Sequence, residues 1–498
     1  MAPVSRFLSL PRELRDAIYE YYVSWDGYTY DFQTRTLKTT EGDPIDLALM
    51  FTCWQVACEM KGVALRNNPI TFRTIYSEET RRSAYSYAEL LQYFCNLKRA
   101  MFKYARPCFT EDLRSKVAQL YPDFMHVFDM NDIDYKWGVN GAGYMPSVIH
   151  SATDYTLELA SSHSQFPEAM SQFEDGFDLY WRGIRVDHKV LNSVRYEPWR
   201  IPTEDEILQM AKACGFRQGH HRWRWTIASS NPIKYYFSAT AACIQFLESI
   251  PASTRAEIRK IVIDEDHPSI GNPAGHARGL IPFCKENPRL KIERRANLWR
   301  NVFLGSLLNK RNVFSYTRVY YPDIRDVTHQ LSATMTGSIS LWAMEALALI
   351  PAGMPQDSFC LVFDGDPEPS KSSELFQHVI QQDATWQAAM EECVRRGFLG
   401  RFDFLKNEEF RYDCYFYRGF PKALCDIVNR RSSIIRCNFG LGTYSLSHLD
   451  SLVEERREWT LEQWRKDWYD RKPDTLITSC TMLGWMNRLD EMCEWTFM

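Results

Sequence analysis

The chain has 498 residues, of which 45% are hydrophobic and 24% charged, and 59 Lys and Arg against 63 Asp and Glu give a formal net charge of −4. This composition excludes a disulfide-stapled miniprotein and an intrinsically disordered chain. The nearly balanced charge gives no overall field that would attract nucleic acid or an anionic membrane. A chain of this length corresponds to roughly two to four domains.

The first residues predict no secretory signal, because charged side chains appear before an apolar core of about seven residues can form. The longest apolar run, residues 341–353, is broken by Glu345 and Pro351 and is shorter than the roughly 20 residues that cross a bilayer. The 14 cysteines form no C-x-x-C pair, which favours reduced, buried thiols. We therefore predict an intracellular protein, cytoplasmic or nuclear, with no membrane partner, no bound metal and no cofactor.

The first predicted element is an amphipathic helix that begins at Pro11, a residue suited to the first helical position. We expect Leu14, Ile18 and Tyr22 on one face of this helix. The charged side chains predicted on the opposite face are Arg12, Arg15, Asp16 and Glu20. Residues 26–42 alternate in polarity between two glycines and predict two short strands and a turn, a small β insert.

A second helix is predicted to begin at Asp43, which would cap its N-terminus, while Asp46 would favour the helix dipole. We expect this helix to continue to about Arg66. The alternating residues 70–75 then predict a strand.

The rest of the chain alternates helical and strand patterns. Helices are predicted at residues 86–104, 110–120, 204–213, 239–249, 372–397 and 449–470. Two segments, 241–266 and 341–366, align without gaps, and each predicts a helix, an Ile-Pro-Ala turn and a short buried strand that ends in Asp-x-Asp. A further helix at 275–286 and a strand at 290–294 extend the alternation, as in irregular leucine-rich or other α/β repeat arrays.

The predicted fold is helix-rich and belongs to the α+β or mixed α/β class. It consists of an N-terminal helical module with a small β insert, followed by an α/β body with two related helix-turn-strand units. The predicted parts are a helical module at 1–75, a mixed α/β region at 76–234, an α/β body at 235–400 and a C-terminal helical region at 401–498. No Gly-, Ser- or Pro-rich linker decides whether the body is one unit or two packed domains.

Three stretches near the N-terminus carry a family resemblance: Phe7-Leu-Ser-Leu-Pro-Arg-Glu-Leu-Arg-Asp-Ala-Ile-Tyr19, Leu47-Ala-Leu-Met-Phe-Thr-Cys-Trp-Gln-Val56 and Ile70-Thr-Phe72. The chain resembles the large F-box-like families of filamentous ascomycete fungi. In those families an L-P-x-E-L/I-R helix is followed by a T-C-x-Q-V type helix and a short N-x-x-x-F strand. The resemblance is specific over residues 5–75, partial over 235–300 and vague elsewhere.

An F-box implies a three-helix hook that docks on a Skp-type linker subunit of a cullin ubiquitin ligase, with a separate domain for substrate recognition. Carried onto this chain, the resemblance implies a set of apolar docking residues: Leu10, Pro11, Leu14 and Ile18 from the first helix, and Leu47, Leu49 and Val56 from the second. The chain departs from the family pattern by the β-like residues inserted between Val23 and Asp43. By pattern alone, the same apolar residues are equally consistent with packing of the two helices onto the body.

The Asp-x-Asp end of the first repeat suggests a second class of function. Asp264 and Asp266 offer hard oxygens directly after a buried strand, which is a common geometry for a divalent cation. The corresponding end of the second repeat, residues 364–366, is not followed by a histidine as the first is by His267. Because neither copy has a Gly-rich phosphate loop, a solvated strand end is the simpler interpretation.

Residues 217–225 (Arg-Gln-Gly-His-His-Arg-Trp-Arg-Trp) interleave cations with aromatic side chains, as surfaces that bind single strands do. As a strand, however, this segment would place Trp223 and Trp225 on one face and Arg222 and Arg224 on the other. The pattern therefore does not favour nucleic acid as a partner.

The C-terminal helix predicted at 449–470 carries an aromatic stripe formed by Leu452, Trp459, Trp464 and Trp468. We expect this stripe to pack against the body. If it is exposed instead, it is a candidate partner site.

The sequence thus predicts a non-enzymatic intracellular protein-interaction protein, and the family resemblance makes it a substrate adaptor whose partners are a Skp-type linker and a cullin. The alternative is an accessory or enzymatic protein of a fungal pathway, such as a secondary-metabolite pathway, with a divalent metal at Asp264 and Asp266. A third interpretation makes the N-terminal helices a cap without a partner, and full burial of Leu14 and Ile18 would favour it.

Overall fold

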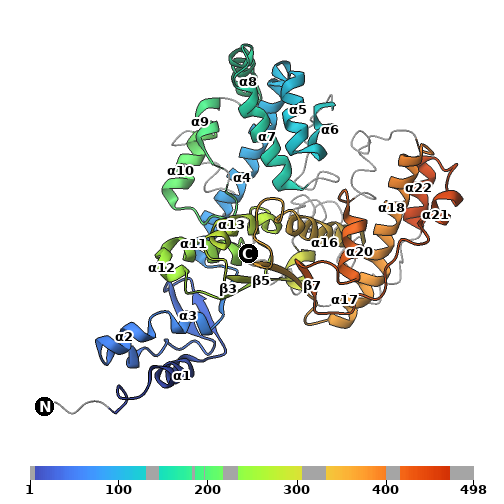
Figure 1. Ribbon diagram of the computed structural model, residues 1–498. Helices are drawn as coiled ribbons and strands as arrows, with labels where there is room; N and C mark the ends of the chain where they lie inside the picture. Colours follow the sequence, from blue (N-terminus) through green and yellow to red (C-terminus); the bar gives the residue numbers. More distant parts are fainter. Residues whose placement is uncertain are drawn as a thin grey trace, which may run out of the picture.

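The computed structural model describes residues 6–129, 145–181, 186–195, 197–216, 234–304, 332–399 and 416–470. Over these residues the chain is a helix-rich mixed α/β fold built on one seven-stranded sheet (Figure 1). This confirms the predicted mixed class. The predicted residues 217–225 lie outside the described part of the chain.

The sheet crosses the whole described molecule in the order β2-β1-β3-β4-β5-β6-β7. Its strands are β1 (Tyr28–Asp31), β2 (Thr36–Thr39), β3 (Ile70–Arg73), β4 (Lys260–Glu265), β5 (Lys291–Asn297), β6 (Phe359–Asp364) and β7 (Ile435–Cys437). Strands β1 and β2 are antiparallel, and every other neighbouring pair is parallel. From β3 to β7 the strands follow chain order, as in α/β repeat arrays.

The helices fall into three groups along the chain. At the N-terminus lie α1 (Arg12–Val23), η1 (Ala48–Phe51), α2 (Trp54–Met60) and α3 (Val63–Asn67). A central helical group contains α4 (Glu78–Tyr104), η2 (Arg106–Cys108), α5 (Glu111–Leu120), η3 (Pro122–Phe124), α6 (His126–Asp129), α7 (Pro146–Ala160), α8 (Phe166–Trp181), α9 (His188–Ser193) and α10 (Glu204–Ala213).

The third group accompanies β4 to β7 and continues to the end of the described chain. It contains α11 (Ala239–Ser249), α12 (Ala252–Arg255), η4 (Pro273–Leu280), α13 (Ile281–Glu286), η5 (Leu298–Val302), α16 (Ser332–Leu347), α17 (Pro369–Leu375), η6 (Phe376–Ile380), α18 (Gln381–Arg396), α20 (Phe420–Val428), α21 (Leu449–Glu455) and α22 (Leu461–Asp470). Among the described helices, none is both long enough and apolar enough to cross a membrane.

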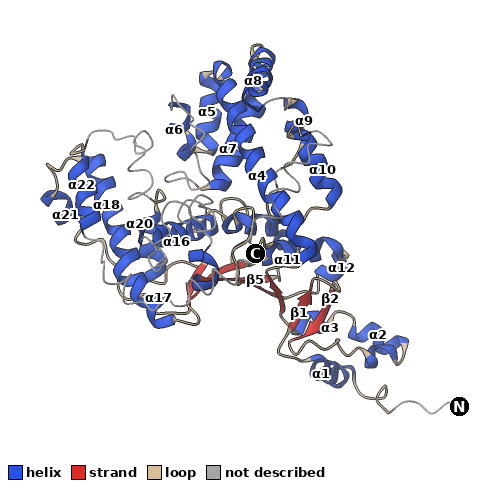
Figure 2. Cartoon of the chain, turned by 180° about the vertical axis from the view of Figure 1, so that it is seen from behind, coloured by secondary structure: helices blue, strands red, loops and turns tan. Residues whose placement is uncertain are grey.

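The sheet is covered by described helices on one face. In β4, Ile261 and Ile263 are fully buried on the side that packs against α11, whereas Lys260 points to the other side and is exposed. Figure 1 shows α11, α13 and α16 together on one side of the sheet, and Figure 2 shows α11 and α16 there from behind. Parallel sheets are usually covered on both faces, whereas the helices of the described ranges cover this one on a single face.

The two predicted repeats are confirmed as helix-turn-strand units. The first consists of α11, a turn at Pro251 and β4, and the second consists of α16, a turn at Pro351 and β6. Strand β5 lies between β4 and β6, so the two units are next-but-one neighbours in the sheet. The further predicted helix and strand correspond to η4 with α13 and to β5.

The N-terminal elements confirm one prediction and correct another. The two strands expected in residues 26–42 are β1 and β2, and β1 also pairs with β3, so they form one end of the main sheet. The single helix expected from Asp43 to Arg66 is wrong. Asp43 caps no helix, because its carbonyl accepts a hydrogen bond from the Thr39 N–H in the turn after β2. The chain then forms three short helical pieces, since Cys53 is extended and Gly62 has a φ of +76°.

The longer predicted helices are largely confirmed. The helix predicted at 86–104 begins earlier, at Glu78, because Ser77 and Thr80 form a capping box in front of it. Residues 369–396 are helical throughout, with one wider turn at η6. The helix predicted at 449–470 is two helices, α21 and α22. The predicted boundary at residue 75 stays a prediction, and the strands on either side of it share one sheet.

Candidate functional site

The three N-terminal helices form a small module with its own core. Its buried side chains are Tyr19, Val23, Val56, Met60 and Val63, and this cluster is separate from the large core of the body. Figures 1 and 2 show α1, α2 and α3 at one end of the sheet, away from the helices that cover it.

Helix α1 is fixed to α2 by a salt bridge that the hydrophobic pattern does not predict. Arg15 contacts the Glu59 carboxylate through two nitrogens, at 2.9 and 2.7 Å, and donates a third hydrogen bond to the Leu10 carbonyl at 2.5 Å. The Tyr19 hydroxyl donates to the same carboxylate at 2.8 Å. The Arg15 side chain is 10% exposed and that of Glu59 is 9% exposed, so the pair is largely shielded from water.

These contacts shift the titration of both partners of Arg15. The hydrogen bond from Arg15 holds the pKa of Glu59 at about 2. Burial and the Glu59 carboxylate raise the pKa of Tyr19 to about 12. Across the physiological pH range the Glu59 carboxylate is therefore charged and the Tyr19 phenol is neutral. The contacts of Glu59 with Arg15 and Tyr19 do not change with pH in that range.

The burial of Arg15 decides which face of α1 points outward. Leu14 and Ile18, which were predicted to share one face, are 53% and 40% exposed. Arg15, which was predicted on the opposite, charged face, is 8% exposed because Glu59 and backbone carbonyls satisfy its guanidinium. Tyr22, the third residue of the predicted apolar face, is only partly buried, so the face that packs inward is centred on Tyr19 and Val23.

The module carries a concentrated set of exposed apolar side chains. We call the exposed apolar set Leu14, Ile18, Tyr21, Trp25, Leu47, Phe51 and Trp54. These are seven of the eleven large hydrophobic residues that are exposed in the described part of the chain. Three of them, Tyr21, Phe51 and Trp54, are 87%, 81% and 82% exposed. Single exposed apolar residues are ordinary, but seven within residues 14–54 are a concentration of the kind that interaction sites show.

The predicted docking residues are divided between this surface and the interior. Leu14, Ile18 and Leu47 belong to the exposed apolar set, and Pro11 is also exposed. The remaining predicted residues are less accessible: Leu10 and Leu49 are half-buried and Val56 is 2% exposed. Val56 is therefore a core residue of the module, since it packs among the buried side chains of α1 and α3.

Four members of the exposed apolar set were not predicted from the sequence. Tyr21 lies three residues after Ile18 and seven after Leu14, so the helical period itself places it on their side of α1. Phe51 and Trp54 were assigned to one continuous helix, and the break at Cys53 changes which way they face. No signal in the sequence marks that break.

One buried side chain joins the module to the sheet. Asn68 is 1% exposed, and its amide nitrogen donates to the carbonyls of Val23 and Ala64 at 2.7 and 2.9 Å. Its amide oxygen accepts from the Trp25 N–H at 2.9 Å. Asn68 thus holds the ends of α1 and α3 together just before β3, which aligns the exposed helices with the sheet.

The predicted metal site lies at the carboxyl end of β4, where polar neighbours already engage its residues. Asp266 accepts a hydrogen bond from Thr74 and lies 3.2 Å from His267 Nδ1. Burial opposes the charged form of Asp266, but the interaction with His267 lowers the pKa of Asp266 below its ordinary value. Burial and the nearby carboxylates of Asp266 and Asp364 raise the pKa of Asp264 to about 6.

These carboxylates do not form a metal-ligating cluster among the described residues. The one group of three potential ligands found there is Glu174, Asp187 and His188, at the far side of the helical region. In that group His188 is hydrogen-bonded to Glu174 at 2.6 Å, and Asp187 accepts from the backbone N–H groups of Lys189 and Val190 at the start of α9, so each of the three side chains already has a partner. Asp264 and Asp266 gain no third ligand, and the described geometry lends no support to the metal alternative.

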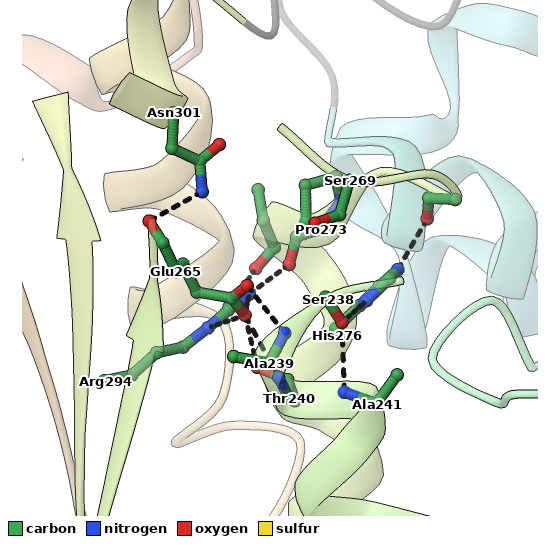
Figure 3. Close-up of polar contacts among 12 residues, drawn as sticks. Ser238, Ala239, Thr240, Ala241, Glu265, Ser269, Pro273, His276, Arg294 and Asn301 are labelled. Carbon is green, nitrogen blue, oxygen red and sulfur yellow. Dashed lines mark hydrogen bonds and ion pairs between the residues drawn. The ribbon is translucent and has the colours of Figure 1, made fainter. Parts of the chain in front are cut away.

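Between the two aspartates lies a buried carboxylate that the sequence analysis did not single out. Glu265 is fully buried, faces the covered side of the sheet and is paired with Arg294 of β5 at 2.6 Å (Figure 3). It also accepts hydrogen bonds from the N–H groups of Ala239 and Thr240 at the start of α11. Of the three acidic residues at the end of β4, Glu265 is therefore buried and structural, whereas Asp264 and Asp266 are more accessible.

A buried serine and histidine lie beside this network. Ser238, which caps α11, is 2.7 Å from His276 Nδ1, and the other ring nitrogen is 2.8 Å from the Gly271 carbonyl (Figure 3). The His276 ring therefore donates to Gly271 and accepts from the serine hydroxyl. Burial lowers the pKa of His276 to about 3, and both side chains are at most 1% exposed. The pair links α11 to η4 and is not accessible to a substrate.

Two of the tryptophans in the predicted C-terminal stripe pack against the body, as expected. Trp464 is fully buried and lies edge-to-face against Trp386 of α18, with ring centroids 5.2 Å apart. The Arg456 guanidinium lies over the rings of Trp459 and Trp464. The side chain of Trp468, the third tryptophan of the stripe, lies outside the described part of the chain.

Comparison with protein-family models, with curated proteins and with solved structures finds no match to this chain. The family and the function predicted from the N-terminal motifs therefore stay predictions.

Proposed function

We propose that this chain is a non-enzymatic protein-interaction protein whose N-terminal module docks on a Skp-type linker subunit of a cullin ubiquitin ligase. The observation that carries this proposal is the exposed apolar set, which concentrates seven large hydrophobic side chains within residues 14–54. Aromatic side chains of this kind are enriched at the centres of protein interfaces. In this role the α/β body would hold the substrate of the ligase.

The way α1 is held also supports a docking role. The salt bridge between Arg15 and Glu59 fixes the inward face of α1, so that Leu14 and Ile18 are presented on a helix that is already ordered. A preorganised surface loses less conformational entropy on binding than a flexible one. The exposure of both residues also argues against a cap without a partner, which would bury them.

The test is an affinity purification of the intact chain from fungal lysate beside a Leu14→Asp/Ile18→Asp variant, with mass spectrometry of the co-purified proteins. We expect the intact chain to recover a Skp-type linker and a cullin, and the variant to lose both. Charges placed in an apolar interface leave unpaired, desolvated groups, and a loss of at least about tenfold in recovery is expected.

A matched control carries the same chemical change elsewhere. Leu120 and Val190 are 58% and 42% exposed and belong to the central helical group, so Leu120→Asp/Val190→Asp should keep both partners. Thermal unfolding of each variant verifies the fold, since substitutions at exposed sites change stability little. Recovery of neither partner by a well-folded intact chain, or equal loss in both variants, would contradict the proposal.

A further inference from the structure

The face of the sheet that no described helix covers is lined by long cationic side chains. Side chains alternate along each strand, and residues paired between neighbouring parallel strands point to the same side. The exposed charged residues on this open face are Arg73, Lys260, Lys291, Arg295 and Arg436. Its acidic residues, among them Asp264, Glu293 and Asp364, are only partly exposed. The outermost charges of the open face are therefore positive.

Three of these arginines occupy one row across the sheet. Arg73 pairs in register with Asp264, Asp264 with Arg295, Arg295 with Val362, and Val362 with Arg436. The row thus places an arginine on every second strand, at β3, β5 and β7. Because neighbouring strands lie about 4.8 Å apart, successive arginines start about 10 Å apart.

The arginines of this row are available to a ligand. Within the described part of the chain, the guanidinium groups of Arg73 and Arg436 form no hydrogen bond and no ion pair, and both residues are exposed. Arg295 is paired with Glu293 at 2.7 Å but remains 48% exposed. Asp264 lies between Arg73 and Arg295 and attracts both guanidinium groups, although it reaches neither closely enough for an ion pair.

We propose that the open face binds an extended acidic segment of a partner protein that crosses the strands and places a carboxylate at every third residue against Arg73, Arg295 and Arg436. A polyproline-type segment rises about 3.1 Å per residue, so its third residue advances about 9 Å and returns to the same side. This matches the spacing of the arginine row. Guanidinium groups bind carboxylates in a planar, bidentate geometry, which gives the row its selectivity for acids.

The open face fits a protein segment better than a nucleic acid. Proteins that bind single strands stack bases on aromatic side chains, and the residues of β1 to β7 on this face include none. Carboxylates beneath the arginines would also repel a continuous phosphate backbone. An isolated carboxylate every 9 to 10 Å avoids that repulsion.

The test measures binding of a labelled peptide to the full chain by fluorescence anisotropy at low salt. The probe is a 12-residue peptide with four Glu-Ala-Pro repeats, and its comparison is a peptide of the same composition with the four glutamates adjacent. We expect the spaced peptide to bind more tightly than the clustered one. We expect an Arg73→Glu/Arg295→Glu/Arg436→Glu variant to bind it about tenfold more weakly or worse.

The matched control changes three exposed lysines that lie off the sheet, in the variant Lys61→Glu/Lys189→Glu/Lys422→Glu. Both variants receive the same change in net charge, so the control should retain binding. Equal loss in the two variants, no binding to the folded intact chain, or equal affinity for the two peptides would overturn the inference. Tighter binding of a 12-nucleotide strand that is lost in the arginine variant would also overturn it, in favour of nucleic acid.

This inference deepens the proposed function and rests on it only for the role of the bound segment as a substrate of the ligase. The peptide assay contains no linker and no cullin, so the two ideas fail separately. The arginine variant should still recover the Skp-type linker, and the Leu14→Asp/Ile18→Asp variant should still bind the peptide.

Discussion

Glu265 has no exposed surface, yet it lies between two aspartates that a sequence pattern offers as metal ligands. Its side chain faces the covered side of the sheet, where Arg294 and the start of α11 satisfy it. Burial lowers the pKa of Arg294, and the neighbouring Glu265 opposes that shift. The charged form of Arg294 therefore depends on its partner carboxylate, as in other buried ion pairs.

Replacement of Glu265 by alanine should lower the free energy of unfolding by about 3–5 kcal/mol, because Arg294 would remain buried without a counter-charge. The measurement is urea denaturation followed by circular dichroism. In a Glu265→Leu/Arg294→Met chain, which removes both charges, we expect part of this loss to be restored. A single Glu265→Ala chain as stable as the parent would show that the pair is dispensable.

Asp264 gives the chain a pH-dependent stability. Its pKa rises from an ordinary value of 3.8 to about 6, so the folded chain binds a proton more tightly than the unfolded chain between these values. The protonated Asp264 side chain therefore contributes to the free energy of unfolding. This contribution is fully present below about pH 4 and is lost as the pH rises through 6.

Asp264→Asn should therefore raise the free energy of unfolding by roughly 1–3 kcal/mol at pH 8 and by less at pH 5. Urea titrations of both chains at the two pH values measure the difference. A gain of equal size at pH 5 and pH 8 would show that the carboxylate does not titrate in this range.

At the scale of elements, the turns that join α1, α3 and β3 to their neighbours depend on contacts between distant residues, which the hydrophobic periodicity of the sequence does not identify. Patterns of two and of 3.6 residues correctly predicted β1, β2, β3, α1 and both repeats, because each of those elements buries one regular face. The break between α2 and α3 has another cause. Gly62 adopts positive φ, and a side chain there would collide with Glu257, a residue nearly 200 positions away in sequence. No local pattern contains that contact.

The candidate site, too, was predictable from the sequence only in part. The apolar type of Leu14 and Ile18 was evident from the sequence, but their exposure follows from the burial of Arg15, which in turn depends on Glu59 in another helix. The open face of the sheet was similarly hidden, because Arg73 and Arg436 become part of one row only when β3 and β7 join the same sheet.

Asn68→Ala tests the junction between the module and the sheet. The substitution should lower the free energy of unfolding by about 2–4 kcal/mol. It leaves the Val23 and Ala64 carbonyls and the Trp25 N–H without their buried hydrogen-bond partner. Hydrogen exchange should show faster exchange at the end of α1 and at α3, with the body less affected. An Asn68→Asp chain retains the acceptor for the Trp25 N–H but points a buried carboxylate oxygen at two carbonyl oxygens, so it should be at least as destabilised. Unchanged exchange in α1 would contradict this role.

At the scale of the whole molecule, the first 75 residues supply one end of the sheet as well as the exposed module. Tyr30 of β1, Phe72 of β3 and Phe246 of α11 form a cluster of rings with centroids 5.2–5.4 Å apart. Ile70 and Phe72 are fully buried in the core of the body. The N-terminal strands are therefore part of the body in packing, even though the helices beside them form a separate small core.

A chain that begins at residue 76 should consequently fail to remain monomeric. Removal of β1, β2 and β3 exposes the edge of β4 and the apolar surface of α11, and unpaired edges promote association. Size-exclusion chromatography and thermal unfolding of the truncated and full chains measure the effect. A truncated chain that elutes as a monomer and unfolds at the temperature of the full chain would show that the sheet does not need its first three strands.

The pairing of β3 with β4 also bears on how the protein is made. Ile70 pairs with Ile261, so a ribosome that adds about 5–20 residues per second needs about 10–40 seconds to deliver the partner of β3 after β3 itself is synthesised. During that interval β3 can pair with β1 but lacks β4 and α11, so Ile70 and Phe72 are incompletely covered and are available to other nascent chains. Chaperones that hold hydrophobic segments should therefore bind this region early in translation, and slower elongation before residue 260 should lower the yield of native protein.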